Sequence, residues 1–166
     1  MEQAPRATLR VAIAGVCVVV AYAVLAAVQI FVLNPLAAVP GVALNEIYAE
    51  MDAAGEGNGW IFAVVVLAGA CVLAVALAVA VLRARMGPEG AAMMFLAFLV
   101  GGAPTYFMAS FGPGMGLADT FGVSGGDHSG WGALFYGVSL LALVTLVALA
   151  IRRALLGRQP AAARGQ

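Results

Sequence analysis

Four long stretches of apolar residues alternate with short polar stretches along the chain. The apolar stretches cover residues 11–33, 60–82, 91–111 and 131–151, and none of them contains a charged residue. A helix needs about 20 apolar residues to cross the hydrocarbon core of a bilayer, whereas a membrane-spanning strand alternates apolar and polar residues over about 9–11 positions. The pattern therefore predicts an all-α integral membrane protein, a single-domain four-helix transmembrane bundle built as two helical hairpins.

The arginines predict the orientation of these spans. Two precede the first span, two lie between the second and the third, and four follow the fourth: Arg6, Arg10, Arg83, Arg85, Arg152, Arg153, Arg158 and Arg164. Basic residues are retained on the cytoplasmic side of a membrane, so we expect both termini in the cytoplasm. The loops 34–59 and 112–130 are then extracytoplasmic, and all their charged residues are acidic.

The two predicted outer loops differ in character. The first contains apolar residues at i, i+3, i+4 and i+7, namely Leu44, Ile47, Tyr48 and Met51. This spacing predicts a short amphipathic helix over about 43–53, with Glu46 and Glu50 on its opposite face. The loop 112–130 is rich in glycine, and we expect it to be mobile unless another surface orders it.

Composition and charge narrow the possible partners. Of the 166 residues, 64% are hydrophobic and 10% are charged, against about 25% charged in an ordinary soluble domain. The formal net charge is zero, so no basic excess favours nucleic acid. Every basic residue is arginine in a chain dominated by Ala, Val, Gly and Leu, which is typical of a GC-rich bacterial genome. We expect a bacterial plasma membrane protein whose partners are the lipid bilayer and a second membrane protein or another copy.

Uncharged polar residues gather in the outer parts of three predicted spans. They are Gln29, Thr105, Tyr106, Ser110, Tyr136 and Ser139. Polar groups in hydrocarbon cost free energy unless they are hydrogen-bonded or hydrated, so we expect these side chains to face one another or an outward-facing pocket. Pro104 follows two glycines beside this cluster and removes a backbone donor, which predicts a kink in the third span.

Rows of small residues mark expected helix contacts. The second span contains Ala70, Ala74 and Ala78 at one spacing, and the third contains Ala97 and Gly101. Small residues let helix backbones approach closely in lipid, where no hydrophobic force drives helices together. These rows are predicted packing faces, either within the chain or between copies.

Side chains that could bind a ligand or take part in a reaction lie mainly in the predicted outer loops. The candidate contact residues there are Glu46, Glu50, Asp119, Asp127 and His128. The spacing of the last three matches no established metal signature, and His128 is the one histidine in the chain. Cys17 and Cys71 fall within predicted spans at different depths, so we expect no redox pair. No metal site and no cofactor is predicted.

Three functions remain open at this point. The leading hypothesis is a non-catalytic accessory or partner-binding subunit with acidic extracytoplasmic loops. The alternative is a small homo-oligomeric transporter or channel protomer that uses the outward-facing polar pocket. The second alternative is a membrane enzyme acting at the outer face through Asp119, Asp127 and His128. No ionisable residue interrupts a span, which counts against a proton pump or an ion-coupled carrier.

Overall fold

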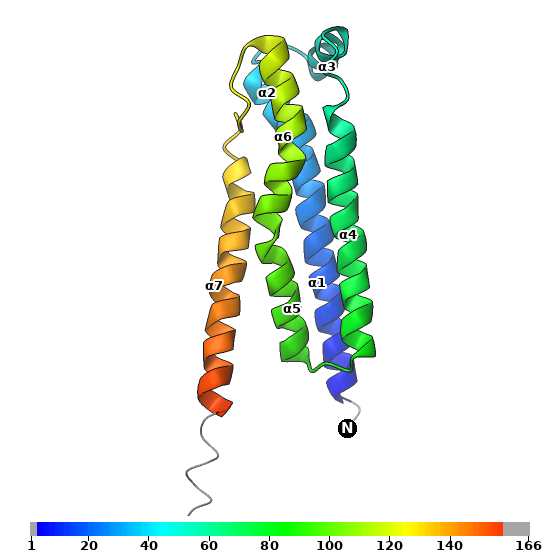
Figure 1. Ribbon diagram of the computed structural model, residues 1–166, viewed down its shortest axis with the longest axis vertical. Coiled ribbons are helices and arrows are strands. Elements are labelled where there is room, and N and C mark those ends of the chain that lie inside the picture. The colour runs from blue at the N-terminus through cyan, green and yellow to red at the C-terminus, as the bar shows by residue number, and fades with distance from the viewer. Residues whose placement is uncertain (1–2, 158–166) are drawn as a thin grey trace, which may run out of the picture.

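The computed structural model describes residues 3–157, which contain helices and connecting turns but no strand. Four helical segments are long and apolar enough to cross a membrane: Arg6–Ala38, Gly59–Arg83, Pro88–Phe121 and Gly132–Leu156. They run side by side along the long axis, and the chain reverses direction between successive segments (Figure 1). These are the features of a multi-pass membrane protein.

Two of these segments are interrupted, so the structure has more helical elements than spans. The elements are α1 (Gln3–Val28), the π-helical turn η1 (Gln29–Leu33), α2 (Asn34–Ala38), α3 (Leu44–Ala53), α4 (Gly59–Arg83), α5 (Pro88–Val100), α6 (Gly102–Phe121) and α7 (Gly132–Gly157). α1, η1 and α2 form the first long segment, and α5 and α6 form the third.

The described arginines lie at one end of the structure, and all the described carboxylates except Glu89 lie at the other. The turn between α4 and α5 lies beside the start of α1 and the end of α7 (Figure 1). We call this the arginine end, and its described arginines are Arg6, Arg10, Arg83, Arg85, Arg152 and Arg153. α3 and the end of α6 lie at the opposite, acidic end, whose carboxylates are Glu46, Glu50, Asp52, Glu56, Asp119 and Asp127.

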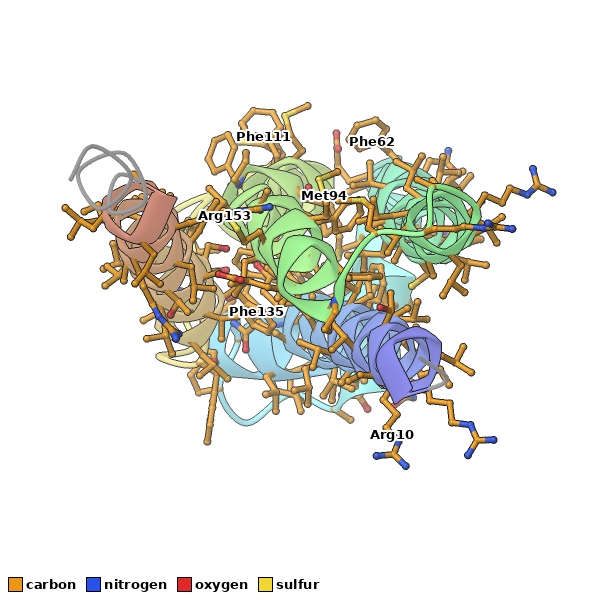
Figure 2. The ribbon with its side chains drawn as sticks, turned by 90° about the horizontal axis from the view of Figure 1, so that it is seen from below. Arg10, Phe62, Met94, Phe111, Phe135 and Arg153 are labelled. Carbon is orange, nitrogen blue, oxygen red and sulfur yellow. The ribbon has the colours of Figure 1, made fainter. Side chains whose placement is uncertain are left out.

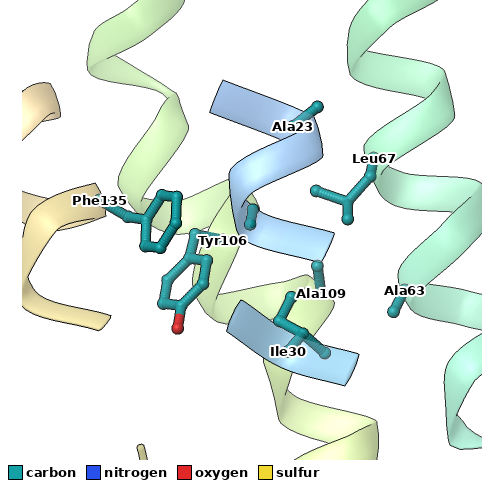
Figure 3. Packing of buried hydrophobic residues seen from close by; sticks show 8 residues of the cluster. Ala23, Ile30, Ala63, Leu67, Tyr106, Ala109 and Phe135 are labelled. Carbon is teal, nitrogen blue, oxygen red and sulfur yellow. The ribbon is translucent and has the colours of Figure 1, made fainter. Parts of the chain in front are cut away.

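The helices pack around the interrupted third segment. α1 contacts α4 and α5, α6 contacts α4 and α7, and α5 contacts α7, so α5 and α6 lie between α4 and α7 when viewed from the arginine end (Figure 2). Much of the core is alanine, which permits close helix approach. Its central cluster is Ala23, Ala26, Ile30, Ala63, Leu67, Tyr106, Ala109 and Phe135 (Figure 3). Large apolar side chains such as Val72 and Leu141 are exposed on the outside, as a lipid-facing surface requires.

The first segment extends beyond the predicted span 11–33 because its helix continues through a π turn. Pro35 has no backbone N–H, so the carbonyl of Phe31 loses its usual helical donor. The N–H of Asn34 instead donates to the carbonyl of Gln29, which closes the wider π turn. The hydroxyl of Tyr48 donates to the Phe31 carbonyl at 2.9 Å. A hydroxyl from α3 therefore replaces the donor that Pro35 lacks.

α3 occupies nearly the range that the amphipathic pattern predicted. Ile47 and Met51 are buried and pack with Ala38 and Leu117. Burial raises the pKa of Tyr48 above its ordinary value, so its hydroxyl remains a protonated donor to Phe31 at neutral pH. The apolar face and one hydrogen bond thus fix α3 across the acidic end.

The loop expected over 112–130 is much shorter, because α6 continues to Phe121. Glycine is a poor helix former, but close packing overrides that preference here. A Cβ at Gly59 would lie 2.9 Å from the carbonyl carbon of Gly112, so the backbones of α4 and α6 touch. Pro113 and Leu117 are buried on the same helix. Gly122 ends α6 with φ 67°, in the left-handed region that favours glycine.

The two predicted rows of small residues differ in how far they are covered by other helices of the chain. Ala74 is fully buried, and Ala78 is half-buried. In contrast, Ala70, Ala97 and Gly101 line a mostly apolar groove of about 530 Å³ between α1, α4 and α5. Within the chain, Ala74 and Ala78 of the second-span row are covered, whereas Ala70 and both members of the third-span row face the groove.

Candidate functional site

The polar residues predicted to gather in one place form two clusters. We define the upper cluster, toward the acidic end, as Gln29, Asn34, Tyr106, Asp127 and Tyr136. We define the deeper cluster as Tyr22, Thr105 and Ser139, which surround the interruption between α5 and α6. The upper cluster lies against a pocket and a loop. The hydroxyls of the deeper cluster donate hydrogen bonds to backbone carbonyls.

Tyr106 is the centre of the upper cluster. It is completely buried, and its ring stacks on Phe135 with centroids 4.4 Å apart and an interplanar angle of 16° (Figure 3). The ring of Tyr136 meets Tyr106 edge-on at 5.7 Å. Offset-stacked and edge-to-face pairs are the favourable arrangements of aromatic rings, so α6 and α7 are joined here by a specific contact.

Two polar contacts hold the loop after α6 against the helices. The Tyr106 hydroxyl lies 3.0 Å from each carboxylate oxygen of Asp127 and donates to that group. The backbone N–H of His128 donates to Oδ1 of Asn34 at 2.7 Å. The second contact joins residues 94 positions apart, so the loop that was expected to be mobile is attached to both α6 and α2.

Gln29 has unused hydrogen-bonding capacity inside the protein. Its side chain is 1% exposed, and neither Nε2 nor Oε1 has a hydrogen-bond partner in the described part of the chain. The amide lies beside the Tyr106 hydroxyl. An unpaired buried polar group costs about 1–3 kcal/mol. π turns like the one that begins at Gln29 occur frequently at functional sites.

A small pocket lies next to this cluster, between α2, α6, α7 and the loop. Its volume is about 120 Å³. The residues that line it are Asn34, Phe107, Ser110, Phe111, Gly114, Gly125, Gly126, Asp127 and Tyr136. Asp127 is the charged member of this lining, and three of the others are aromatic. The pocket therefore combines one carboxylate with an aromatic wall.

The deeper cluster satisfies the interrupted backbone near Gly101. Pro104 lies three residues beyond that glycine, where it removes a helical donor and makes the interruption favourable. Ser139 donates to the carbonyl of Leu99 at 2.9 Å, and Thr105 donates to the carbonyl of its own helix at Gly101 at 2.7 Å. The hydroxyl protons of both residues are therefore committed to structural hydrogen bonds with backbone carbonyls.

Close packing around Gly102 reinforces that assignment. A Cβ at Gly102 would lie 3.0 Å from Ser139 Oγ and 3.0 Å from Tyr22 Cζ. The Tyr22 hydroxyl also donates to the carbonyl of Phe135 at 3.4 Å, a long hydrogen bond to α7. The deeper cluster therefore joins α1, α5, α6 and α7, and its members Tyr22 and Thr105 also line the apolar groove of about 530 Å³ between α1, α4 and α5.

The remaining candidates stay apart from the pocket. Glu46, Glu50 and Asp119 are exposed at the acidic end, and none lines the pocket. His128 Nε2 lies 2.8 Å from the carbonyl oxygen of nearby Ser124. Residues 3–157 contain no group of three or more His, Cys, Asp and Glu side chains that could hold a metal ion. The acidic candidates therefore form a surface rather than a site.

Sequence reasoning missed Asn34 and did not connect Asp127 with Tyr106. Asn34 follows the predicted first span directly, and its position before Pro35 was the available signal, because a proline there makes an irregular helix. No local pattern could pair Asp127 with Tyr106.

Comparison of the chain with protein-family models, with curated proteins and with solved structures finds no match.

Proposed function

We propose that this protein is a non-catalytic, multi-pass protein of a bacterial plasma membrane that binds a partner protein through its acidic end. The observation that carries the proposal is the fixed presentation of exposed carboxylates. Glu46 and Glu50 lie on α3, whose other face is buried through Ile47 and Met51. Asp119 is exposed on α6 nearby. A rigid charged surface binds a complementary partner without a large ordering cost.

The proposed orientation follows from the separation of charge. Positively charged loops stay in the cytoplasm, so the arginine end is cytoplasmic and the acidic end extracytoplasmic. Arg10 and Arg153 extend from different helices at the arginine end (Figure 2). Both termini are then cytoplasmic.

Reporter fusions test this orientation. Alkaline phosphatase fused after Gln166 is expected to be inactive, because that enzyme needs the oxidising extracytoplasmic side to form its disulfides. The same reporter fused after Gly55, between α3 and α4, is expected to be active. A green fluorescent protein fused after Gln166 serves as the expression control. Phosphatase activity after Gln166 would contradict the orientation.

The distribution of polar groups favours a binding role over a conduit. The upper cluster and the pocket lie in the half nearer the acidic end. In the other half, the buried side chains are apolar, for example Ala12, Val19, Val81, Ala91 and Phe95, apart from Thr8, whose hydroxyl donates to the carbonyl of Met86 at 3.0 Å. A conduit for ions or polar solutes needs polar groups or water along its whole length, and one threonine bonded to a backbone carbonyl does not supply such a path.

Charge-neutral substitutions on α3 test the partner-binding surface. We expect a stoichiometric second protein in native mass spectrometry of the tagged chain, extracted from its own membrane in a mild detergent. The triple variant Glu46→Gln, Glu50→Gln, Asp52→Asn should lose most of this partner, because it removes three exposed negative charges. Complex formation should also weaken at high salt, which screens exposed charges.

The matched control is Glu89→Gln, which removes a carboxylate at the arginine end and should leave the complex intact. A closed homo-oligomer without a second protein would contradict the accessory role and favour the alternative of a transporter or channel protomer. Equal complex formation by the triple variant and the wild type would contradict the acidic surface as the binding site.

A further inference from the structure

The pocket beside Tyr106 has the chemistry of a cation site. We propose that it binds a small organic ammonium ion, with Asp127 as the counter-ion and Phe107, Phe111 and Tyr136 as the aromatic wall. All four residues line the pocket of about 120 Å³ between α2, α6, α7 and the loop after α6. This binding site is separate from the exposed carboxylates of α3 and does not depend on the partner proposed above.

Asp127 has negative charge that the surrounding protein does not neutralise. It accepts a hydrogen bond from the Tyr106 hydroxyl, which leaves further lone pairs on its two oxygens. The arginines of residues 3–157 lie at the opposite end of the structure (Figure 1). Tyr106 is itself buried and stacked on Phe135, so it holds the carboxylate in place at the pocket. A positively charged ligand is therefore the favoured complement.

The aromatic side chains favour an organic cation over a bare metal ion. The rings of Phe107 and Phe111 have centroids 6.0 Å apart on successive turns of α6, and Tyr136 lines the pocket from α7. Aromatic faces attract ammonium groups through their quadrupole and also cover attached carbon atoms. A divalent metal would need several oxygen ligands, and no cluster of three acidic or histidine side chains exists within the described chain.

The polar lining offers acceptors for N–H donors. The hydroxyl of Ser110 donates to the carbonyl of Phe107 at 3.1 Å, so its lone pairs remain available. Asn34 Oδ1 accepts one hydrogen bond from His128 and can accept a second. A primary ammonium carries three N–H donors, which matches Asp127 and these two oxygens better than a quaternary ammonium would.

The size of the pocket limits the ligand. About 120 Å³ corresponds to roughly four water volumes and is well below the volume of drug-sized sites. It suits an ammonium group with a few carbon atoms. Phe107, Phe111 and Tyr136 are each about half exposed on the outside of the helices. The ammonium can therefore belong either to a free small amine or to the ethanolamine headgroup of a membrane lipid.

Ethylamine is the probe for direct binding. The full chain is placed in nanodiscs of phosphatidylglycerol, which has no amine, and titrated with carbon-14-labelled ethylamine at neutral pH and constant ionic strength. We expect saturable binding that Asp127→Asn weakens by about tenfold, because one charge-assisted contact is lost. Asp119→Asn makes the same chemical change on an exposed part of α6 outside the pocket and should bind like the wild type.

A second variant distinguishes a loss of the binding site from a loss of the folded structure. Phe111→Leu changes an exposed side chain and leaves Asp127 and Tyr106 in place, so it should fold normally. We expect it to weaken ethylamine binding about threefold, the size of one exposed cation–π contact. Wild-type affinity in both Asp127→Asn and Phe111→Leu would overturn the proposal.

Lipid retention distinguishes the two sources of the ammonium. In nanodiscs that contain phosphatidylethanolamine and phosphatidylglycerol in equal amounts, native mass spectrometry measures which lipid stays bound. Selective retention of phosphatidylethanolamine that Asp127→Asn abolishes supports the headgroup. Ethylamine binding without that selectivity supports a free amine. Neither ethylamine binding nor selective retention would overturn the ammonium site.

Discussion

Replacing Tyr106 with alanine is expected to lower the free energy of unfolding by about 3–5 kcal/mol. The side chain is fully buried, stacks on Phe135 and holds Asp127 through its hydroxyl. Its removal leaves a cavity between α6 and α7, because packed helices relax only partly. It also removes one of the two polar contacts that hold the loop after α6, leaving the hydrogen bond from His128 to Asn34.

Equilibrium unfolding in detergent micelles measures this loss. Tyr136→Ala is the matched control, since it deletes the same atoms from a side chain that is 43% exposed, and its cost should stay near 1 kcal/mol. Equal losses for the two variants would contradict the assigned core. Tyr106→Phe keeps the ring and removes the hydroxyl, so it should cost about 1 kcal/mol and increase hydrogen exchange in residues 123–131.

Replacing Gly59 with leucine is expected to lower the free energy of unfolding by about 3 kcal/mol. A Cβ at this position would lie 2.9 Å from the carbonyl carbon of Gly112 and 3.0 Å from its oxygen. Backbone atoms cannot rotate away as a side chain can, so α4 and α6 must separate. The separation should also disturb the packing of Met51 of α3 against Leu117 of α6.

Gly69→Leu is the control for this change because it places the same side chain on the same helix. A Cβ at Gly69 meets nothing within 4 Å, and leucine is a better helix former than glycine. The control should therefore unfold at the same or a slightly higher denaturant concentration than the wild type. A similar loss in both variants would show that α4 tolerates no bulk at either position, contrary to the close approach at Gly59.

The long apolar segments and α3 could be predicted from local patterns, whereas the helical part of 112–121 could not. Length and apolarity are properties of each segment alone, and the positions of Ile47 and Met51 already define the buried face of α3. In contrast, Gly112, Gly114 and Gly116 disfavour a helix when considered locally. Their helical conformation depends on contacts with α3, with α4 and with the turn between them, since Gly116 lies close to Met51 of α3 and to Glu56 of the turn.

The candidate site was also predictable only in part, because its arrangement depends on contacts between residues far apart in the chain. Gln29, Tyr106 and Tyr136 were identifiable because a polar group inside an apolar span needs a partner or water. Their arrangement was not, since Tyr106 meets Asp127 across 21 residues and Asn34 meets His128 across 94. Thr105 and Ser139 satisfied the same sequence criterion but proved to bind backbone carbonyls at the interruption near Gly101.

Local sequence specifies four segments suited to a membrane, the separation of most arginines from most acidic residues, and an amphipathic helix between the first two segments. Each of these follows from the solvation of a segment by lipid or water, which depends on local composition. The tertiary structure alone decided which hydroxyl replaces the donor missing at Pro35, and which carboxylate faces an aromatic pocket. Those contacts join residues far apart in the chain, and they form only where helix packing brings the two groups within hydrogen-bonding distance.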